Sequence, residues 1–521
     1  MCGIHFTKNV SRKKFKKSLD LLYHRGPNAS DVKQFDNIFL GHTRLAIIDL
    51  DKRSSQPFTG SDNETHIIFN GEIYNFKELK KQFNIKTRTS SDTEILLELY
   101  LKLGEDVVNH LNGMFAFVIY NSRTKDIFIA RDRLGIKPLY IYEKNDTLII
   151  SSEIASILES LEFVPEYDLI GIRQYLKLRT FFRGHTLYKD IKMFPAGYYR
   201  KNDQLVQYWN LENHYSTDYN DEKVKELIES SIEYRLISDV ETGSYLSGGI
   251  DSSLIAVLAQ KEYTWTTGFN DFNEFEYARI VAERYKFNHQ EVITSRDEFK
   301  DVAKFMIEKR KEPLSVPNEV SIFEMTQAVA KHNTVVLSGE GADELFFGYD
   351  RIFRWAQNNE FDLESFDKLY SYGTHKDDEI IQYVLEPVAH IKDNLLKIST
   401  FFQLYHLHGL LRRLDNATML CSVEARVPFV DHRLIEYMYG IGCEYKMKNG
   451  IVKEPLKRIF SDVLPSEIIN RKKVGFPIPI HDIFHNKDCS MDGWLHFNIE
   501  TILKDDWTKI TEQLKTEDIY V

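Results

Sequence analysis

The chain has 521 residues, of which 43% are hydrophobic and 28% charged, a balance that is typical of folded globular proteins and excludes wholesale disorder. At about 150 residues per domain, this length allows two to four domains. The 67 Lys and Arg residues against 78 Asp and Glu residues give a formal net charge of −11. This charge argues against a nucleic acid partner, because duplexes are bound by concentrated basic surface.

The sequence shows no sign of a membrane helix, a secretory signal or a disulfide framework. No apolar run approaches the roughly 18 residues that a membrane helix needs, and the first residues lack the charged-then-apolar build of a secretory signal. The four cysteines are too few and too scattered for a disulfide framework or a zinc site; they are Cys2, Cys421, Cys443 and Cys489. We therefore expect a cytoplasmic protein without a membrane partner.

The first two hundred residues are rich in short β segments. The predicted strands cover residues 39–48, 65–69, 114–120, 126–131 and 147–151, which are apolar or alternating runs of strand length. Residues 92–103 place apolar side chains at helical spacing after a cap at Ser90 or Ser91. This mixture predicts a layered α+β domain. Turn residues at 195–210 predict a closing hairpin and a linker.

After residue 221, predicted helices alternate with short buried strands. A strand at 243–247 leads through a glycine turn into a helix at 252–260, and a strand at 264–268 leads into a helix at 274–287. A third strand at 334–337 again ends in a Gly-rich turn. Repeated βα units predict an α/β domain whose parallel sheet binds ligands at the carboxyl ends of its strands. With the mostly helical last third, we predict two domains, 1–205 and 206–521.

Cys2 follows the initiator Met, and a small side chain at position 2 favours removal of that Met. The mature chain would then begin with a thiol whose own α-amine lies on the same carbon. An α-amine has a pKa of roughly 7.7–8.0 and a thiol one of about 8.5, so the amine can accept the thiol proton near neutral pH. Taken singly, however, an early cysteine is usually incidental.

Polar clusters at predicted strand edges add groups that could bind a substrate beside this thiol. Arg44 can grip a carboxylate with its planar fork, and Asp92 can receive an ammonium group. Asn70 and the backbone N–H of Gly71 can present two donors to a developing oxyanion. Together they would recognise an α-amino acid by both its charges. Singly, each has an ordinary explanation as a turn, a surface charge or a helix cap.

These segments together resemble the class II (N-terminal nucleophile) glutamine amidotransferase domain over residues 2–200. The matching motifs are CGI (2–4), HRGP (24–27), RLAIID (44–49), NGEIYN (70–75), SDTE (91–94), LNGMFAF (111–117), ARDRLGIKPLY (130–140) and SSE (151–153). The resemblance implies an αββα fold with Cys2 as the nucleophile and Asp92 on the α-amino group of glutamine. It implies glutamine contacts from Arg44, Leu45, Ala46, Ile47, Ile48, Asn70, Gly71 and Glu72. Two positions depart from the pattern, His5-Phe6 and Asn28.

The second half contains a different kind of site. Residues 245–253 (YLSGGIDSS) are a predicted strand, a glycine turn and a helix start, and such turns let backbone N–H groups approach an anion closely. The Gly-Lys-Ser/Thr of a Walker loop is missing, which disfavours a P-loop ATPase. Because phosphates repel carboxylates, Asp251 here and Asp343 in SGEGADE (338–344) imply an intervening Mg²⁺. Lys453 could neutralise charge on the phosphates.

The order of motifs resembles that of the asparagine synthetase family over about residues 220–480. The motifs are SGGIDSS (247–253), SGEGADE (338–344), EARVPFVD (424–431), KEPLK (453–457) and a basic-aromatic segment at 471–479. The resemblance implies Mg²⁺ on Asp251 and Asp343, Glu340 as general base and Lys453 at the adenylating transition state. It implies ATP contacts from Leu246, Ser247, Gly248, Gly249, Asp251, Ser252, Thr267, Ser338 and Gly339. Residues 311–317 (KEPLSVP) depart from the family's Asp-Glu-Pro run near the acceptor.

The two resemblances imply an ATP-dependent carbon–nitrogen ligase with ATP and Mg²⁺ as cofactors. Glutamine, aspartate and ATP would be its small-molecule substrates. Ammonia released from glutamine would move to the second site through an apolar passage and displace AMP from an aspartyl adenylate. One alternative keeps both half-reactions but amidates a different carboxylic acid, on a sugar, a peptide or another metabolite. A cyclase without glutamine use and a non-catalytic scaffold are further alternatives, against which the intact Cys2 cluster argues. A homodimer is left open.

Overall fold

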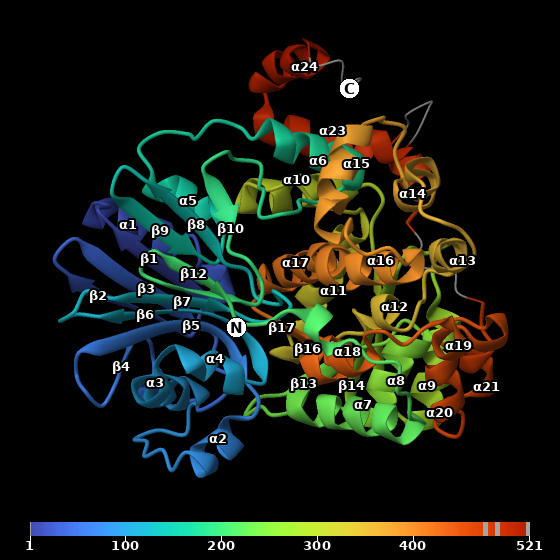
Figure 1. Ribbon diagram of the computed structural model, residues 1–521, viewed down its shortest axis with the longest axis horizontal. Helices are drawn as coiled ribbons and strands as arrows, with labels where there is room; N and C mark the ends of the chain where they lie inside the picture. Colours follow the sequence, from blue (N-terminus) through green and yellow to red (C-terminus); the bar gives the residue numbers. More distant parts are fainter. Residues whose placement is uncertain (1, 473–477, 485–489, 517–521) are drawn as a thin grey trace.

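The computed structural model describes residues 2–472, 478–484 and 490–516 (Figure 1). Met1, Cys489 and residues 473–477 of the basic-aromatic segment lie outside the described residues. The chain forms two lobes, which the colours of Figure 1 separate into a blue to teal one on the left and a green to red one on the right. Within these ranges, no helix is long and apolar enough to cross a membrane.

The N-terminal lobe contains two six-stranded antiparallel sheets, in the orders β10-β8-β9-β1-β3-β2 and β12-β11-β7-β6-β5-β4. The strands of the first sheet are β1 (Gly3–Lys8), β2 (Ala29–Phe35), β3 (Ile38–Arg44), β8 (Tyr140–Lys144), β9 (Thr147–Ser151) and β10 (Ile191–Met193). Those of the second are β4 (Phe58–Thr59), β5 (Thr65–Ile73), β6 (Gly113–Asn121), β7 (Ile127–Arg131), β11 (Tyr198–Lys201) and β12 (Gln204–Gln207). The last two strands are the hairpin predicted at 195–210.

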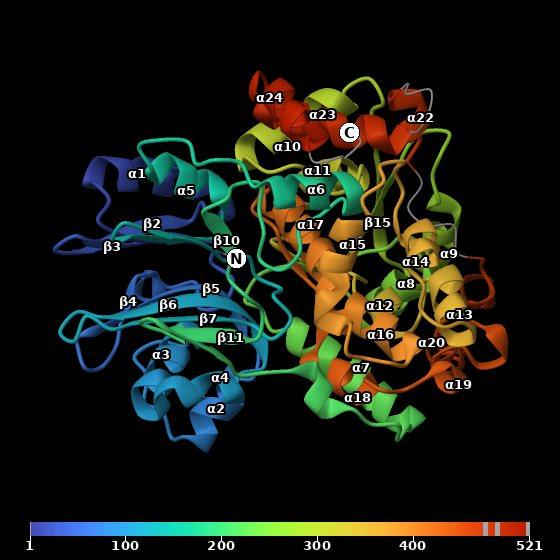
Figure 2. The ribbon, with the colours of Figure 1, turned by 45° about the horizontal axis from the view of Figure 1, so that its top comes forward.

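The two sheets stack face to face, with helices on both outer faces (Figure 2). One outer layer contains α1 (Arg12–Asp20) and α5 (Ile154–Ser160); the other contains α2 (Phe76–Gln82), α3 (Asp92–Leu103) and α4 (Val107–His110). Between the sheets lies an apolar cluster that includes Ile4, Phe6, Ile68 and Val118. The αββα prediction is therefore confirmed. The helix expected at 92–103 has those bounds, and Ser91 Oγ caps it by accepting from Thr93 N at 3.1 Å.

The C-terminal lobe is built on a five-stranded parallel sheet in the order β15-β14-β13-β16-β17. The strands are β13 (Thr242–Tyr245), β14 (Tyr263–Gly268), β15 (Asn288–Ile293), β16 (Val335–Leu337) and β17 (Glu424–Arg426). The helices that alternate with them are α7 (Asp221–Arg235), α8 (Ile250–Ala259), α9 (Phe275–Tyr285), α10 (Phe299–Arg310) and α11 (Asn318–Val329). The predicted α/β class is confirmed; β15 and β17 are additional to the predicted strands.

Helices make up most of the described chain after β16, as expected. They are α12 (Ala342–Leu345), α13 (Asp350–Asn358), α14 (Leu363–Tyr370), α15 (Asp378–Leu385), α16 (Asn394–Phe401), α17 (Leu407–Met419), α18 (His432–Met438), α19 (Cys443–Lys446), α20 (Glu454–Ile459), α21 (Ser466–Ile469), α22 (Ile480–Ile483), α23 (Ser490–Leu503) and α24 (Asp506–Thr516). Helix α6 (Leu169–Leu178) comes from the N-terminal half but lies against this lobe (Figure 2).

Helix α23 packs on the core of the C-terminal lobe rather than extending from it. Trp494 is fully buried, and its Nε1 donates to Ser315 O at 3.3 Å. Asn498 Oδ1 accepts from Leu314 N at 2.8 Å. These bonds fix the backbone of the 311–317 segment, which we expect near the acceptor.

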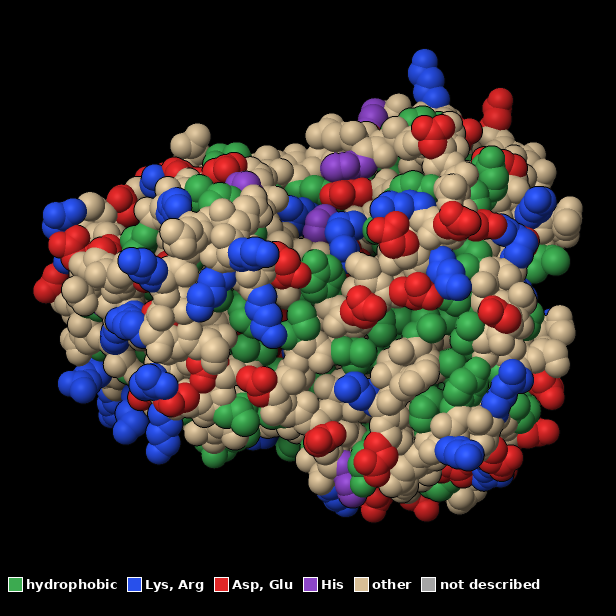
Figure 3. All heavy atoms as spheres, turned by 90° about the horizontal axis from the view of Figure 1, so that it is seen from below, with side chains coloured by type: hydrophobic (Ala, Val, Ile, Leu, Met, Phe, Trp, Pro, Cys, Tyr) green, Lys and Arg blue, Asp and Glu red, His purple; other side chains and the backbone are tan. Residues whose placement is uncertain are grey.

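Acidic and basic side chains are interspersed over most of the face seen in Figure 3. Lys and Arg side chains gather at its left end, on the N-terminal lobe (Figure 3). Both lobes therefore present mixed charge on this face.

Candidate active site

Cys2 precedes β1 in the N-terminal lobe and is buried, with 8% of its surface exposed. Its backbone N donates to Asn70 Oδ1 at 3.1 Å, and its Sγ lies 3.9 Å from Leu45 O. Arg25 Nε donates to Cys2 O at 3.2 Å. Three different segments therefore fix this residue, and burial raises the pKa of its thiol.

Asn70 and Gly71 lie near the end of β5, beside Cys2. Asn70 is fully buried, and its Nδ2 has no hydrogen-bond partner among the described residues. Gly71 has a φ of +151°, and a Cβ there would lie 2.0 Å from Met114 O, so only glycine fits. A buried amide donor without a partner costs free energy unless a ligand satisfies it. The pair can thus supply donors to an oxyanion near Cys2.

Charged groups surround this position. Arg44 is 7% exposed and donates to the backbone oxygens of Asp49 and Asp51. Asp92 accepts from Ile73 N at 3.0 Å, and burial raises its pKa to about 6. Burial, with Glu424 and Asp92 nearby, also raises the pKa of Glu72. The site therefore holds a buried guanidinium and buried carboxylates.

The segment 45–48 forms the boundary of this site with the C-terminal lobe. Leu45 and Ile47 pack in one apolar cluster with Val335 and Met419, and Ile48 contacts the same cluster. Ala46 N donates to Asn28 Oδ1 at 2.9 Å, so the departure at Asn28 supports the backbone of the site. His5, the other departure, is bonded to Ser18 and Ser160 and takes no part in the site.

A cavity of about 740 Å³ lies at the carboxyl ends of the parallel strands in the C-terminal lobe. The predicted nucleotide residues that line it are Leu246, Ser247, Gly249, Asp251, Ser252, Thr267, Ser338 and Gly339. Gly248 belongs to the same turn without lining the cavity; its φ is +71°, and a Cβ would lie 2.5 Å from that of Tyr277. A Cβ on Gly339 would lie 3.1 Å from Ser252 N, so the two Gly-rich loops are adjacent.

Lys453 joins the two predicted metal ligands. Its Nζ lies 2.5 Å from Asp251 Oδ2 and 2.6 Å from Asp343 Oδ1, with all three side chains on the cavity wall. Burial lowers the pKa of Lys453, but the two carboxylates outweigh it and raise the pKa above the usual value. Among the described residues, no group of three or more His, Cys, Asp or Glu side chains could hold a metal ion. Asp251 and Asp343 alone would therefore be an incomplete metal site. Mg²⁺ is commonly held by one or two carboxylates together with substrate phosphates, and this pair fits that pattern.

Glu340 lies on the same cavity wall and accepts from Arg413 Nη2 at 2.5 Å. Ser315, at the end of the divergent 311–317 segment, also lines the cavity. Glu312 of that segment points elsewhere: it is buried and accepts from Tyr140 Oη at 3.2 Å. The acidic residue that this segment retains therefore supports the lobe boundary rather than the cavity.

Sequence patterns missed the roles of three side chains that the structure places at these sites: Arg25, Asp415 and Arg413. Arg25 stands within the HRGP motif, but its bond to Asp415 on α17 spans 390 positions. Arg413 lies two positions from Asp415 and reaches Glu340. The sequence signal for Arg413 was its position next to Arg412 on a predicted helix, and adjacent basic residues of this kind are usually exposed to solvent.

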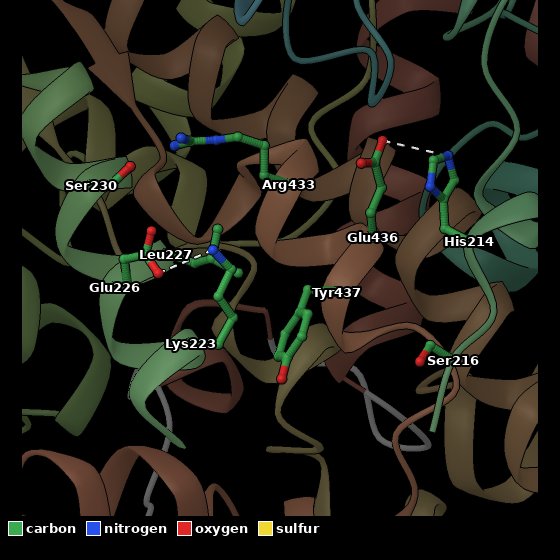
Figure 4. Close-up of a pocket in the computed structure, with 9 residues that line it drawn as sticks. All are labelled: His214, Ser216, Lys223, Glu226, Leu227, Ser230, Arg433, Glu436 and Tyr437. Atoms are coloured by element: carbon green, nitrogen blue, oxygen red, sulfur yellow. Dashed lines mark hydrogen bonds and ion pairs between the residues drawn. The ribbon is translucent and has the colours of Figure 1, made fainter. Parts of the chain in front are cut away.

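A second cavity of about 480 Å³ lies between α7 and α18 (Figure 4). Its charged groups satisfy one another: Lys223 Nζ is 3.0 Å from Glu226, and His214 Nε2 is 3.6 Å from Glu436. The described residues that line it include none of those predicted from the sequence. We assign no chemistry to this cavity.

Comparisons with known proteins match a family model to each half of the chain. The family model for the glutamine amidotransferase domain matches residues 1–210, and that for asparagine synthase matches residues 223–495. Asparagine synthetase (glutamine-hydrolyzing) 3 of Bacillus subtilis (strain 168) is 29% identical, over 92% of this chain and 88% of that protein. Asparagine synthetase (glutamine-hydrolyzing) 1 of the same organism is 30% identical, over 91% and 85%.

A third relative is archaeal. The putative asparagine synthetase (glutamine-hydrolyzing) 2 of Methanocaldococcus jannaschii is 33% identical, over 67% of this chain and 76% of that protein. The asparagine synthase model alone matches more than half of the 521 residues. The chain therefore belongs to the asparagine synthase family.

Proposed function

We propose that this chain is a glutamine-dependent asparagine synthetase. Glutamine is hydrolysed to glutamate and ammonia in the N-terminal lobe, and ATP adenylates the side-chain carboxylate of aspartate in the C-terminal lobe. Ammonia then displaces AMP to give asparagine, with pyrophosphate as the other product. The observation that carries the proposal is the presence, in one chain, of two sites. One is a buried thiol beside Asn70 Nδ2, which has no hydrogen-bond partner among the described residues, and the other is a cavity lined by two Gly-rich loops and Lys453.

In the first half-reaction, Cys2 Sγ attacks the carboxamide carbon of glutamine. Once Met1 is removed, the α-amine of Cys2 takes the thiol proton and passes it to the departing ammonia. Asn70 Nδ2 and Gly71 N–H bind the oxyanion. The γ-glutamyl thioester that remains is hydrolysed by water.

Recognition of glutamine follows from the charges around Cys2. Arg44 binds the α-carboxylate and Asp92 the α-ammonium, with Glu72 and the 45–48 segment completing the contacts. A guanidinium and a carboxylate set apart in this way favour an α-amino acid over an acid or an amine alone.

In the second half-reaction, the loops at 246–252 and 338–343 hold ATP, with Thr267 on the same wall. Asp251 and Asp343 would hold Mg²⁺, which neutralises phosphate charge. Lys453 then stabilises the charge that develops as the acid attacks the α-phosphorus and pyrophosphate leaves. Glu340 takes a proton from the attacking ammonia, oriented by Arg413.

Ammonia has a short apolar route between the two sites. The cluster of Leu45, Ile47, Val335 and Met419 begins at the residue whose carbonyl faces Cys2 Sγ and includes a residue of β16. Strand β16 leads directly to Ser338 and Glu340. Neutral ammonia crosses such a cluster more easily than ammonium does, because burying a charge is costly.

We place the division of the chain at residues 205/206 and the enzyme in the cytoplasm.

The test uses purified full-length protein with Mg-ATP, aspartate and either glutamine or ammonium. We expect asparagine, AMP and pyrophosphate from both nitrogen donors. The Cys2→Ala variant should lose glutamine-dependent synthesis and keep the ammonia-dependent reaction. Pyrophosphate release with another acid but not with aspartate would replace the acceptor, whereas unchanged glutamine use by Cys2→Ala would overturn the first half-reaction.

A further inference from the structure

The 740 Å³ cavity extends beyond the nucleotide loops. Its lining also includes Arg179, at the end of α6, and Tyr349, Tyr370, Tyr372, His406 and Arg413. Neither sequence motifs nor the half-reactions above use this part of the cavity, apart from Arg413. Its lining combines two guanidinium groups with hydroxyl groups and aromatic rings, which is suited to an anionic ligand.

Arg179 is a buried cation without an acidic partner. It is 6% exposed, and its guanidinium donates to the backbone oxygens of Tyr370 at 3.1 Å and Leu178 at 3.5 Å. It also lies 3.9 Å from the centre of the Tyr372 ring. In the part of the chain that the structure describes, it forms no ion pair with Asp or Glu. Burial lowers its pKa, which reflects the cost of its charge without an anion.

Several other buried arginines of this protein have acidic partners. Arg25 is 2.9 Å from Asp415, Arg235 is 2.7 Å from Asp431, and Arg310 is 3.1 Å from Glu319. Arg44 resembles Arg179 instead: it is buried, donates to backbone oxygens and forms no ion pair with Asp or Glu of the described residues. Arg131 also forms no such pair, but its Nε, Nη1 and Nη2 all donate to backbone oxygens, whereas two nitrogens do so in Arg44 and in Arg179. We have placed a substrate carboxylate on Arg44. The same build in a second cavity points to a second substrate carboxylate.

A hydrogen-bonded wall connects Arg179 with the reacting region. Tyr370 Oη is 2.8 Å from His406 Nδ1, whose Nε2 is 3.4 Å from Tyr349 Oη. Tyr349 Oη donates in turn to Glu344 Oε1 at 2.6 Å, next to the metal ligand Asp343. Arg179 and Arg413 both lie near enough to His406 to lower its pKa, after burial itself. Arg179 therefore stands at one end of this wall and Asp343 at the other.

We propose that Arg179 is a specificity-determining residue, which binds the carboxylate of the acceptor that is not activated. This inference rests on the proposed function, since one carboxylate must lie at the nucleotide while the other lies on Arg179. Tyr372 stacks on the guanidinium and Tyr370 orients it through its backbone oxygen. The subsite is specific for charge because a buried guanidinium left without its anion is disfavoured.

The subsite also requires both parts of the chain. Arg179 precedes the division at 205/206, whereas the tyrosines and the nucleotide loops follow it. Residues 206–521 alone would lack the residue that recognises the second carboxylate. The acceptor site is thus completed by a residue of the N-terminal part.

The experiment compares aspartate with 3-aminopropanoate, which is aspartate without its α-carboxylate. Ammonium serves as the nitrogen donor, and pyrophosphate release gives kcat/KM for each acid in full-length wild type, Arg179→Gln and Arg179→Lys. Arg183→Gln is the matched control, since Arg183 lies in the same segment but pairs with Glu386 at 3.2 Å outside the cavity. Glutamine hydrolysis and the KM for ATP report whether each variant is folded.

Wild type and Arg183→Gln should prefer aspartate by about 100-fold or more, the size expected for a buried charge pair. Arg179→Gln should lower kcat/KM for aspartate about 100-fold while changing that for 3-aminopropanoate less than about threefold. Arg179→Lys, which keeps the charge but loses the planar fork, should fall between them. Glutamine hydrolysis and the KM for ATP should stay as in wild type.

The outcomes separate this inference from the proposed function. If wild type uses aspartate and Arg179→Gln keeps the full preference, or loses both acids equally while hydrolysing glutamine normally, the subsite is wrong and the function stands. If another dicarboxylic acid replaces aspartate and Arg179→Gln loses preference for it over its monocarboxylic analogue, the subsite stands and aspartate is wrong. Turnover only of acids that have no second carboxylate would overturn both the subsite and the proposed acceptor.

Discussion

Arg25 and Asp415 form an ion pair of 2.9 Å across the boundary between the lobes, where both side chains are almost fully buried. The same guanidinium holds the carbonyl oxygen of Cys2 through Nε and lies 3.0 Å from Glu153. Asp415 also lies 3.5 Å from Lys137 Nζ. One pair therefore links the position of the nucleophile to α17, the helix whose Arg413 contacts Glu340.

Asp415→Asn should destabilise the protein by about 3–5 kcal/mol, because it removes the carboxylate beside the buried Lys137 and one of the two carboxylates beside Arg25. It should also reduce glutamine-dependent synthesis more than ammonia-dependent synthesis, because Arg25 no longer holds Cys2 firmly. Denaturant unfolding and the ratio of the two activities measure these effects. Asp36→Asn, which removes an exposed pair with Lys125, is the control and should change neither. An Asp415→Asn protein as stable as wild type would contradict the argument.

Glutamine hydrolysis should depend on pH through Asp92. Burial raises the pKa of this carboxyl to about 6, so it is protonated below that pH and cannot hold the α-ammonium of glutamine. We expect kcat/KM for glutamine to rise as pH increases through about 6. Since the pKa is raised on folding from 3.8, Asp92 also makes the fold less stable as pH rises between these values.

The variant Asp92→Asn should lower kcat/KM for glutamine and remove this rise with pH. His5 and His42 cannot replace Asp92 as its source, because burial lowers the pKa of each to about 3. A rise near pH 6 that persists in Asp92→Asn would assign it to another group.

Lys453→Met should abolish most adenylation. Without the ammonium between Asp251 and Asp343, charge building on the phosphates is not neutralised, and pyrophosphate release should fall about 10²–10³-fold. Glutamine hydrolysis in the other lobe should continue. Lys448→Met, at an exposed lysine a few residues away, is the control. Pyrophosphate release within a few-fold of wild type would remove Lys453 from the reaction.

Local patterns predicted most of the framework. Helix α3 was predictable because its cap, acidic first turn and apolar spacing agree. The two Gly-rich loops were predictable because each combines a strand end, glycines and polar residues in a few positions. Strand β17 was missed as a strand because it has three residues, two of them charged, where a parallel strand is expected to be apolar.

Long-range pairs account for the rest. Arg426 on β17 is buried with Nε 2.6 Å from Glu424 Oε1, and its Nη2 lies 3.7 Å from Glu72 in the other lobe. Arg179 meets Tyr370 across 191 positions. No pattern within a window of helix or strand length contains such contacts. The acceptor part of the cavity therefore had to be found from the structure.

The hydrogen bond from Leu314 to Asn498 joins positions 184 residues apart, close to the end of the described chain. During synthesis on the ribosome, the N-terminal lobe can fold as soon as β12 emerges, because domains fold from the N-terminus onward. The wall that α23 supports must wait until almost the whole chain has been translated. The cavity that would use ammonia is therefore completed much later in synthesis than the strands around Cys2.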